Sequence, residues 1–127
     1  MNTTKCKTIL IIAENTDASA LAAAFPGSRV VTPDTAGDSP TQRFASAMVG
    51  FEAACQPSPP DWVILAGEGD GIAASAVAAK KLLLPLARLG TPVPVDPITV
   101  NGPVADVLAD ITAASPAELA RLIEKQA

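Results

Sequence analysis

The sequence predicts a three-layer α/β/α sandwich built on a mainly parallel sheet of four or five strands, with a Rossmann-like or flavodoxin-like arrangement of elements. Apolar runs such as Thr8–Ala13 and Trp62–Ala66 show no polar alternation, as expected for strands buried on both faces of a parallel sheet. Stretches with helical periodicity separate these runs. We expect right-handed crossovers and the strand order 2-1-3-4, with strands 1 and 3 at the centre, in a single domain over residues 1–127.

The amino-acid composition argues against several classes of protein and of function. Apolar residues make up 49% of the chain and charged residues 17%, which argues against disorder. The net charge of −4 makes this an acidic protein that repels phosphate backbones and anionic lipids, so we expect neither nucleic-acid nor membrane binding. The chain has no histidine, which excludes Ser-His-Asp and Cys-His pairs and histidine-ligated zinc.

The cysteines and the N-terminal segment indicate a cytoplasmic protein. Cys6 and Cys55 are far apart in the sequence and are interpreted as two reduced thiols. The apolar run near the N-terminus is too short for a signal peptide or a membrane span.

The first half of the chain alternates strands and helices. The strand Thr8–Ala13 ends at Glu14, a short helix is expected over Ala18–Phe25, and Arg29–Thr32 reads as a second strand. The segment Ser39–Gln42 has a capping-box pattern with proline at the first helical position. The helix that follows carries one apolar stripe at helical spacing, made of Phe44, Met48, Phe51 and Cys55.

The second half begins with the strand Trp62–Ala66 and a glycine-rich turn. An alanine- and leucine-rich helix should follow from about Ile72, with a kink or break near Leu84 because of Pro85. Further elements are expected as an edge strand over Thr91–Pro97, a helix over Pro103–Ala113, and a capped helix over Ser115–Ala127.

The glycine turn suggests one kind of site, a dinucleotide-binding turn. The stretch 69–74 fits G-x-G-x-x-A, so Gly67, Gly69 and Gly71 would let the backbone approach a pyrophosphate, and Asp96 would contact a ribose. The acidic residues within the turn would repel that pyrophosphate, however, and the fingerprint normally follows the first strand of its domain.

The carboxylates suggest a second kind of site. Strand ends carry Glu14, Asp34, Glu68, Asp70 and Asp96, and the carboxyl ends of parallel strands meet at one edge of a sheet. Carboxylates that converge there are suitable ligands for Mg²⁺.

The pattern of Glu14 after the first strand, with Glu68 and Asp70 after a later one, resembles the Toprim domains of primases and topoisomerases. That resemblance implies that Glu14 is a general acid/base and that Glu68 and Asp70 are metal ligands. The implied activity is magnesium-dependent phosphoryl or nucleotidyl transfer, the one alternative under which nucleic acid would be a partner.

The third hypothesis is that the domain acts by binding alone. The glycine turn then only allows close packing between helix and sheet. The peripheral segments Thr91–Pro97 and Ser115–Ala127 could dock a protein partner or a second copy, with a twofold dimer as the default. We favour binding of a small ligand, a nucleotide or a protein partner over catalysis.

Overall fold

The structure is a computed structural model that describes residues 8–90 and 101–126. Its elements are β1 (Ile9–Glu14), α1 (Ser19–Ala24), β2 (Arg29–Val31), α2 (Pro40–Cys55), β3 (Trp62–Gly67), α3 (Asp70–Lys81), β4 (Leu86–Leu89), α4 (Asn101–Leu108), β5 (Ile111–Ala113) and α5 (Pro116–Glu124). The strands form one sheet in the order β2-β1-β3-β4-β5, and neighbouring strands are parallel. The predicted order 2-1-3 of the first three strands is confirmed, whereas the strands that follow β3 in the sheet, β4 and β5, come from segments that were not predicted as strands.

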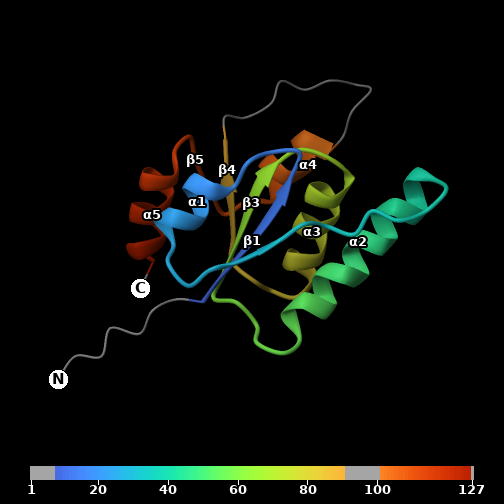
Figure 1. Ribbon diagram of the computed structural model, residues 1–127, viewed down its shortest axis with the longest axis horizontal. Helices are drawn as coiled ribbons and strands as arrows, with labels where there is room; N and C mark the ends of the chain where they lie inside the picture. The colour runs from blue at the N-terminus through green and yellow to red at the C-terminus, as the bar shows by residue number, and fades with distance from the viewer. Residues whose placement is uncertain (1–7, 91–100, 127) are drawn as a thin grey trace.

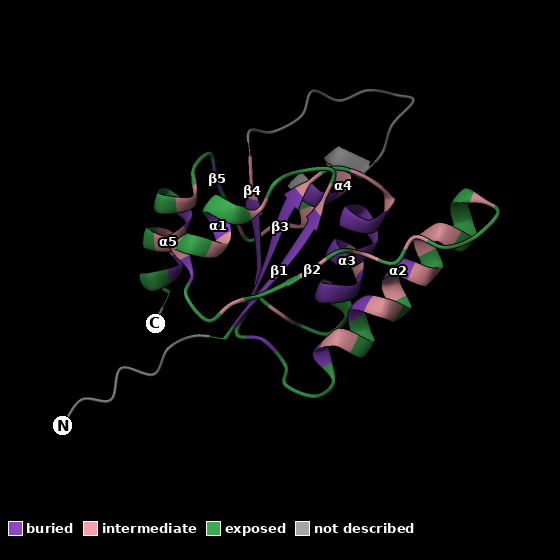
Figure 2. Cartoon of the chain, in the orientation of Figure 1, coloured by how far each residue is buried: buried purple, intermediate pink, exposed green. Residues whose placement is uncertain are grey.

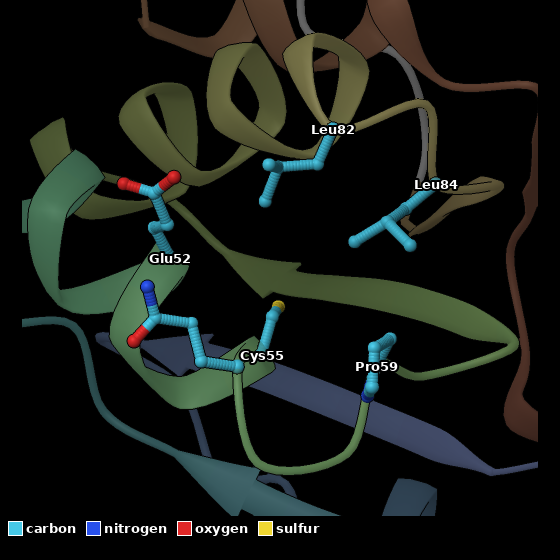
Figure 3. A pocket seen from close by; sticks show the side chains of 6 residues that line it. Glu52, Cys55, Pro59, Leu82 and Leu84 are labelled. Atoms are coloured by element: carbon cyan, nitrogen blue, oxygen red, sulfur yellow. The ribbon is translucent and has the colours of Figure 1, made fainter.

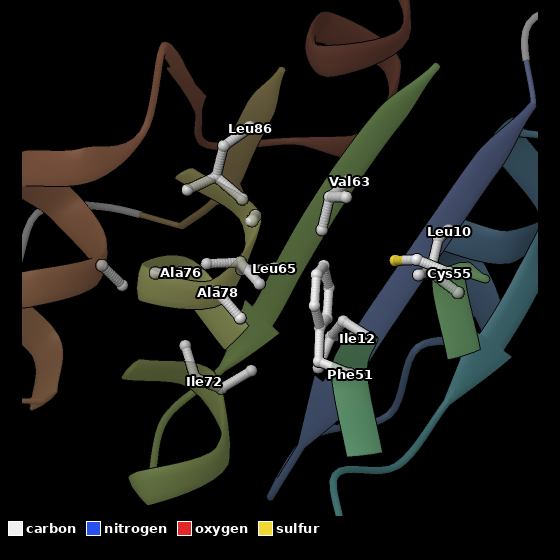
Figure 4. Close-up of a cluster of buried hydrophobic side chains, with 12 residues drawn as sticks. Leu10, Ile12, Phe51, Cys55, Val63, Leu65, Ile72, Ala76, Ala78 and Leu86 are labelled. Atoms are coloured by element: carbon white, nitrogen blue, oxygen red, sulfur yellow. The ribbon is translucent and has the colours of Figure 1, made fainter. Parts of the chain in front are cut away.

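Helices cover both faces of the sheet, which confirms the three-layer sandwich. Helices α1 and α5 lie on one face, and α2, α3 and α4 lie on the other (Figure 1). The strand side chains alternate between two apolar cores because successive residues of a strand point to opposite faces. Ile9 and Ile11 pack in the core with α1 and α5, whereas Leu10 and Ile12 pack in the core with α2 and α3 (Figure 4).

Among the helices, α3 is buried along most of its length (Figure 2). Its buried residues are Gly71, Ile72, Ala73, Ala74, Ser75, Ala76, Ala78 and Ala79. Small side chains let this helix lie close to the sheet and between α2 and α4. No described helix, α3 included, is both long and apolar enough to cross a membrane.

Both predicted helix caps are present. The Ser39 hydroxyl accepts the Gln42 N–H at 3.1 Å, and the Gln42 side chain accepts the Ser39 N–H at 3.2 Å, which completes the capping box of α2. At α5 the Ser115 hydroxyl accepts the Glu118 N–H at 3.2 Å. Leu119 of α5 faces the core, as expected.

The segment after α3 differs from the prediction. Of the kink or break expected near Leu84, the structure shows a break, because α3 ends at Lys81. The unpredicted feature is Leu86–Leu89, which forms β4 between β3 and β5. The chain leaves the helix through Leu83, whose φ of 61° lies in the left-handed region. The leucine, alanine and arginine of β4 favour helices locally, so pairing with two neighbouring strands imposes its extended form.

The region expected as one helix over Pro103–Ala113 contains two elements. Helix α4 ends at Leu108, and Ile111–Ala113 forms the edge strand β5. Val107 of α4 is 80% exposed. A strand of three residues carries too few alternations to be distinguished from the end of a helix. The predicted edge strand Thr91–Pro97 lies outside the described residues.

Candidate functional site

The carboxyl edge of the sheet has a topological switch point between β1 and β3. From β1 the chain crosses to β2 on one side, and β3 lies on the other side of β1. Glu14, the last residue of β1, is in register with Gly67, the last residue of β3. Ligands of open α/β sheets bind at such points, so the sequence argument and the structure place the candidate site at the same edge.

Glu14 forms the centre of this site. Its carboxylate oxygen Oε1 accepts the backbone N–H of Ile72 in the first turn of α3 at 3.0 Å. Burial raises the pKa of Glu14, and the nearby charge of Asp70 raises it further, against the lowering effect of the Ile72 and Gly71 N–H groups. A carboxylate of the chain itself therefore occupies the position where a helix N-terminus attracts anions.

The three turn glycines make room for neighbouring parts of the same chain. A Cβ on Gly67 would lie 1.8 Å from the Glu14 carbonyl oxygen, and one on Gly69 would lie 2.5 Å from the Glu14 carboxyl group. A Cβ on Gly71 would lie 2.3 Å from Cβ of Pro33. Glu14 and Pro33 thus cover the first turn of α3, which argues against a pyrophosphate at this helix N-terminus. Cofactor contacts by the three glycines remain a prediction.

Two other predicted residues flank Glu14. Asp70 forms an ion pair with Arg43 of α2, with 3.5 Å between Arg43 Nε and Asp70 Oδ2. Glu68 is exposed, and its carbonyl oxygen accepts the Asn15 side-chain N–H at 2.9 Å. Asn15 has a φ of 56°, so the loop after β1 turns sharply towards β3.

The predicted metal ligands were Glu68 and Asp70, with Glu14 as the general acid/base beside them. Within the described parts of the chain, no group of three or more histidine, cysteine, aspartate or glutamate residues is arranged to hold a metal ion. Asp34, in the loop after β2, accepts a hydrogen bond from the Ala36 N–H at 3.0 Å and so fixes its own turn. Asp96 lies outside the described residues.

Two arginines near this edge were not predicted from the sequence. Arg43 reaches Asp70 from α2, 27 positions earlier in the chain. Arg88 of β4 is 3% exposed, and its Nη1 donates to the Gly67 carbonyl oxygen at 2.7 Å. The helix caps locate Arg43 in the first turns of α2, but only knowledge of β4 could have located Arg88.

A pocket of about 200 Å³ opens beside the switch point, and we call it the β2 pocket. It is lined by Ile12, Val31, Thr32, Pro33, Asp34, Ala47, Gly50, Phe51 and Ser75. Pro33 separates it from the first turn of α3, since the same residue contacts Gly71. Sequence analysis did not find this pocket, because its walls come from four separate elements and the loop after β2.

Another hollow, of about 210 Å³, lies at the opposite edge, where β3 and β4 begin. Figure 3 shows the Cys55 sulfur pointing into the space lined by Pro59, Leu82 and Leu84. Burial raises the pKa of the Cys55 thiol, so the group stays protonated near neutral pH. A buried, reduced Cys55 is confirmed, and Cys6 lies outside the described residues.

Comparison with known proteins gives a fold and no family. No family model and no curated protein matches this chain. Among solved structures, the UDP-GlcNAc 2-epimerase from Methanocaldococcus jannaschii in complex with UDP-GlcNAc and UDP has a TM-score of 0.72 at 14% identity, over 95% of this chain and 44% of that chain. The S. aureus MnaA–UDP co-structure has a TM-score of 0.70 at 18% identity, over 95% of this chain and 42% of that chain. The UDP-GlcNAc 2-epimerase from Neisseria meningitidis bound to UDP-GlcNAc has a TM-score of 0.70 at 13% identity, over 95% of this chain and 43% of that chain.

These similarities correct the Toprim resemblance. The similar structures are UDP-GlcNAc 2-epimerases and not Toprim domains, so Glu14, Glu68 and Asp70 do not mark a Toprim site. Acidic residues at strand ends arise in any parallel α/β sheet, because the loops at its edges are exposed and polar. This chain spans less than half the length of the epimerases that it resembles, and it shares with them a Rossmann-like α/β fold.

Proposed function

We propose that this chain is a cytoplasmic nucleotide-sugar-binding domain whose ligand occupies the carboxyl edge of the sheet. The observation that carries the proposal is the similarity of nearly the whole chain to epimerases seen with UDP-GlcNAc or UDP. The switch point and the β2 pocket lie at the edge where α/β sheets bind ligands.

The polar groups at this edge suit a ligand rich in hydroxyl groups. Glu14, Glu68 and Asp70 offer carboxylate oxygens, which accept hydrogen bonds from sugar or ribose hydroxyls. Arg43 adds a positive charge beside Asp70 for an anionic part of the ligand.

Binding rather than catalysis remains our interpretation, because the chain has no histidine to transfer protons near neutral pH. Glu14 is the candidate acid or base for any chemistry here, since its raised pKa brings it closer to neutrality.

A thermal-shift titration with UDP-GlcNAc, UDP and free GlcNAc, each with and without Mg²⁺, tests the proposal. A ligand at roughly a hundred times its Kd stabilises the folded state by about 2.7 kcal/mol, which raises Tm by several degrees in a domain of this size. We expect UDP-GlcNAc to raise Tm. Asp70→Asn should reduce the shift, whereas Glu52→Gln, an exposed residue at the opposite edge, should not. No shift with any of the three ligands would contradict the proposal.

A further inference from the structure

We infer that the β2 pocket holds the planar base ring of the nucleotide, an assignment that rests on the proposed function and specifies which part of the ligand enters the fold. A pocket of about 150 Å³ lined by aliphatic and aromatic side chains is large enough to bind benzene. The β2 pocket, at about 200 Å³, therefore has room for a six-membered ring.

The walls of the pocket suit a flat and largely apolar group. Ile12 of β1 and Val31 of β2 contribute aliphatic surface, and Phe51 of α2 contributes an aromatic ring. Ile12 and Phe51 lie beside one another in the core (Figure 4). Aromatic and aliphatic walls stabilise a ring by dispersion and by removing its faces from water.

Small residues of α2 leave the space open. Ala47 and Gly50, midway along α2, line the pocket. Glycine in a helix interior is less favourable than alanine, because it loses more backbone freedom on folding. Gly50 has no steric need to be glycine, because a Cβ there would make only ordinary contact with Cβ of Asp34 at 3.7 Å. The missing side chain instead enlarges the pocket.

The polar groups of the pocket suit the edge of a base. Ser75 of α3 is 1% exposed and lines the pocket, so its hydroxyl is a buried polar group beside the proposed ring. A base supplies both N–H and C=O groups, and a hydroxyl can donate a hydrogen bond to one and accept a hydrogen bond from the other. Thr32 and Asp34 add polar groups from the loop after β2.

The rest of the nucleotide would extend towards Arg43. Arg43, Ala47 and Gly50 are spaced i, i+4 and i+7, so they share one face of α2. Arg43 therefore lies about 10 Å nearer to the N-terminus of α2 than Gly50 does. A diphosphate there would contact a cation and would avoid the first turn of α3, where Glu14 already binds the backbone N–H groups. The acidic edge can in this way accept an anionic ligand.

Calorimetric titration of UDP-GlcNAc into the wild-type chain and two pocket variants tests this inference. Ser75→Ala removes the hydroxyl at nearly constant volume and should weaken binding roughly 2- to 10-fold. Gly50→Leu fills the pocket and should weaken binding at least about 10-fold. Glu52→Leu, on the exposed face of the same helix and beside the hollow at the opposite edge, is the control and should bind as the wild type does.

The outcomes separate the two proposals. If the wild type binds UDP-GlcNAc and Ser75→Ala and Gly50→Leu, both folded by their melting curves, bind equally well, the base lies elsewhere and only this inference is overturned. If the wild type binds no nucleotide sugar, the proposed function fails. Ser75→Ala keeps the test decisive if Gly50→Leu does not fold, because losing one hydroxyl leaves the packing unchanged.

Discussion

Glu14 shows how a single residue changes the interpretation of a glycine turn. The G-x-G-x-x-A pattern indicates that the backbone must approach something closely, but it does not say what. Here the approaching groups are the Glu14 carboxylate and Pro33 of the same chain. A conformation that buries a carboxylate against a helix N-terminus depends on the path of the loop after β1, which the sequence does not encode in any local pattern.

The first prediction concerns the pH dependence that Glu14 imposes. Because its pKa is raised above the ordinary 4.5, the folded protein holds the Glu14 proton more tightly than the unfolded chain. The resulting stabilisation is complete below the unfolded-state pKa and is lost as the pH rises through the folded-state pKa. The free energy of unfolding of the wild type relative to Glu14→Gln should therefore fall from about pH 4 to about pH 7.

Urea unfolding of both proteins across this range measures the difference. Glu52→Gln removes the same charge from the exposed face of α2 and serves as the control. A difference for Glu14→Gln that stays constant or grows as the pH rises would contradict the interpretation.

The close approach of the Glu14 carbonyl oxygen to Gly67 should make an alanine at position 67 especially destabilising. Gly67 and Gly27 have similar φ values, 94° and 83°, but only at Gly67 would a Cβ meet another group. Gly27→Ala should destabilise the fold by about 1–2 kcal/mol, the cost of a left-handed backbone with a side chain. Gly67→Ala should cost a further 1–3 kcal/mol or so, because Glu14 must move. If chemical denaturation gives the same loss in the free energy of unfolding for both variants, the contact with Glu14 does not restrict position 67.

At the scale of elements, periodicity and caps predict β1, α2, β3 and α5, and the topology alone predicts that Glu14 meets Gly67. The fourth strand could not be predicted in this way. Leu86–Leu89 has helical propensity and is extended because it pairs with strands distant in sequence. Because β4 could not be predicted from the sequence, the position of Arg88 within the sheet could not be predicted either. The β2 pocket is likewise a product of tertiary packing, to which no local pattern corresponds.

Asp110 links three elements and leads to a prediction with the opposite sign from that of Glu14. Its carboxylate accepts a hydrogen bond from Nζ of Lys80 in α3 at 2.5 Å and another from the backbone N–H of Leu86 in β4 at 2.8 Å. Burial alone would raise the pKa of Asp110, but the two hydrogen bonds and the charge of Lys80 lower it overall. Its stabilisation is therefore present above the unfolded-state pKa and is lost as the pH falls.

Asp110→Asn should destabilise the protein by about 1 kcal/mol at neutral pH, a modest value because the side chain is 44% exposed. The loss should shrink as the pH falls from about 6 to about 3. Urea unfolding at each pH measures this loss. Asp38→Asn, at an exposed aspartate in the loop before α2, shows how much an aspartate-to-asparagine change elsewhere contributes. A loss that grows in acid would contradict the role assigned to Asp110.

At the scale of the whole molecule, one sheet separates two apolar cores, and each core contains a natural probe. Trp62, the only tryptophan, lies in the core with α1 and α5. Cys55 lies in the core with α2 and α3 (Figure 4). If residues 1–127 form a single domain, as we propose, both cores lose their packing together because they share the same strands.

Urea unfolding followed by Trp62 fluorescence and by labelling of Cys55 should then give coincident transitions in a Cys6→Ser background, which leaves one thiol to report. Coincidence is expected because β1 and β3 contribute side chains to both cores, so neither core can open without exposing strands that support the other. Cys55 labelling at a lower urea concentration than the Trp62 transition would show that α2 and α3 detach first. Such a result would mean that the layer carrying the β2 pocket opens as a separate unit, and that nucleotide-sugar binding should stabilise this layer more than the opposite one.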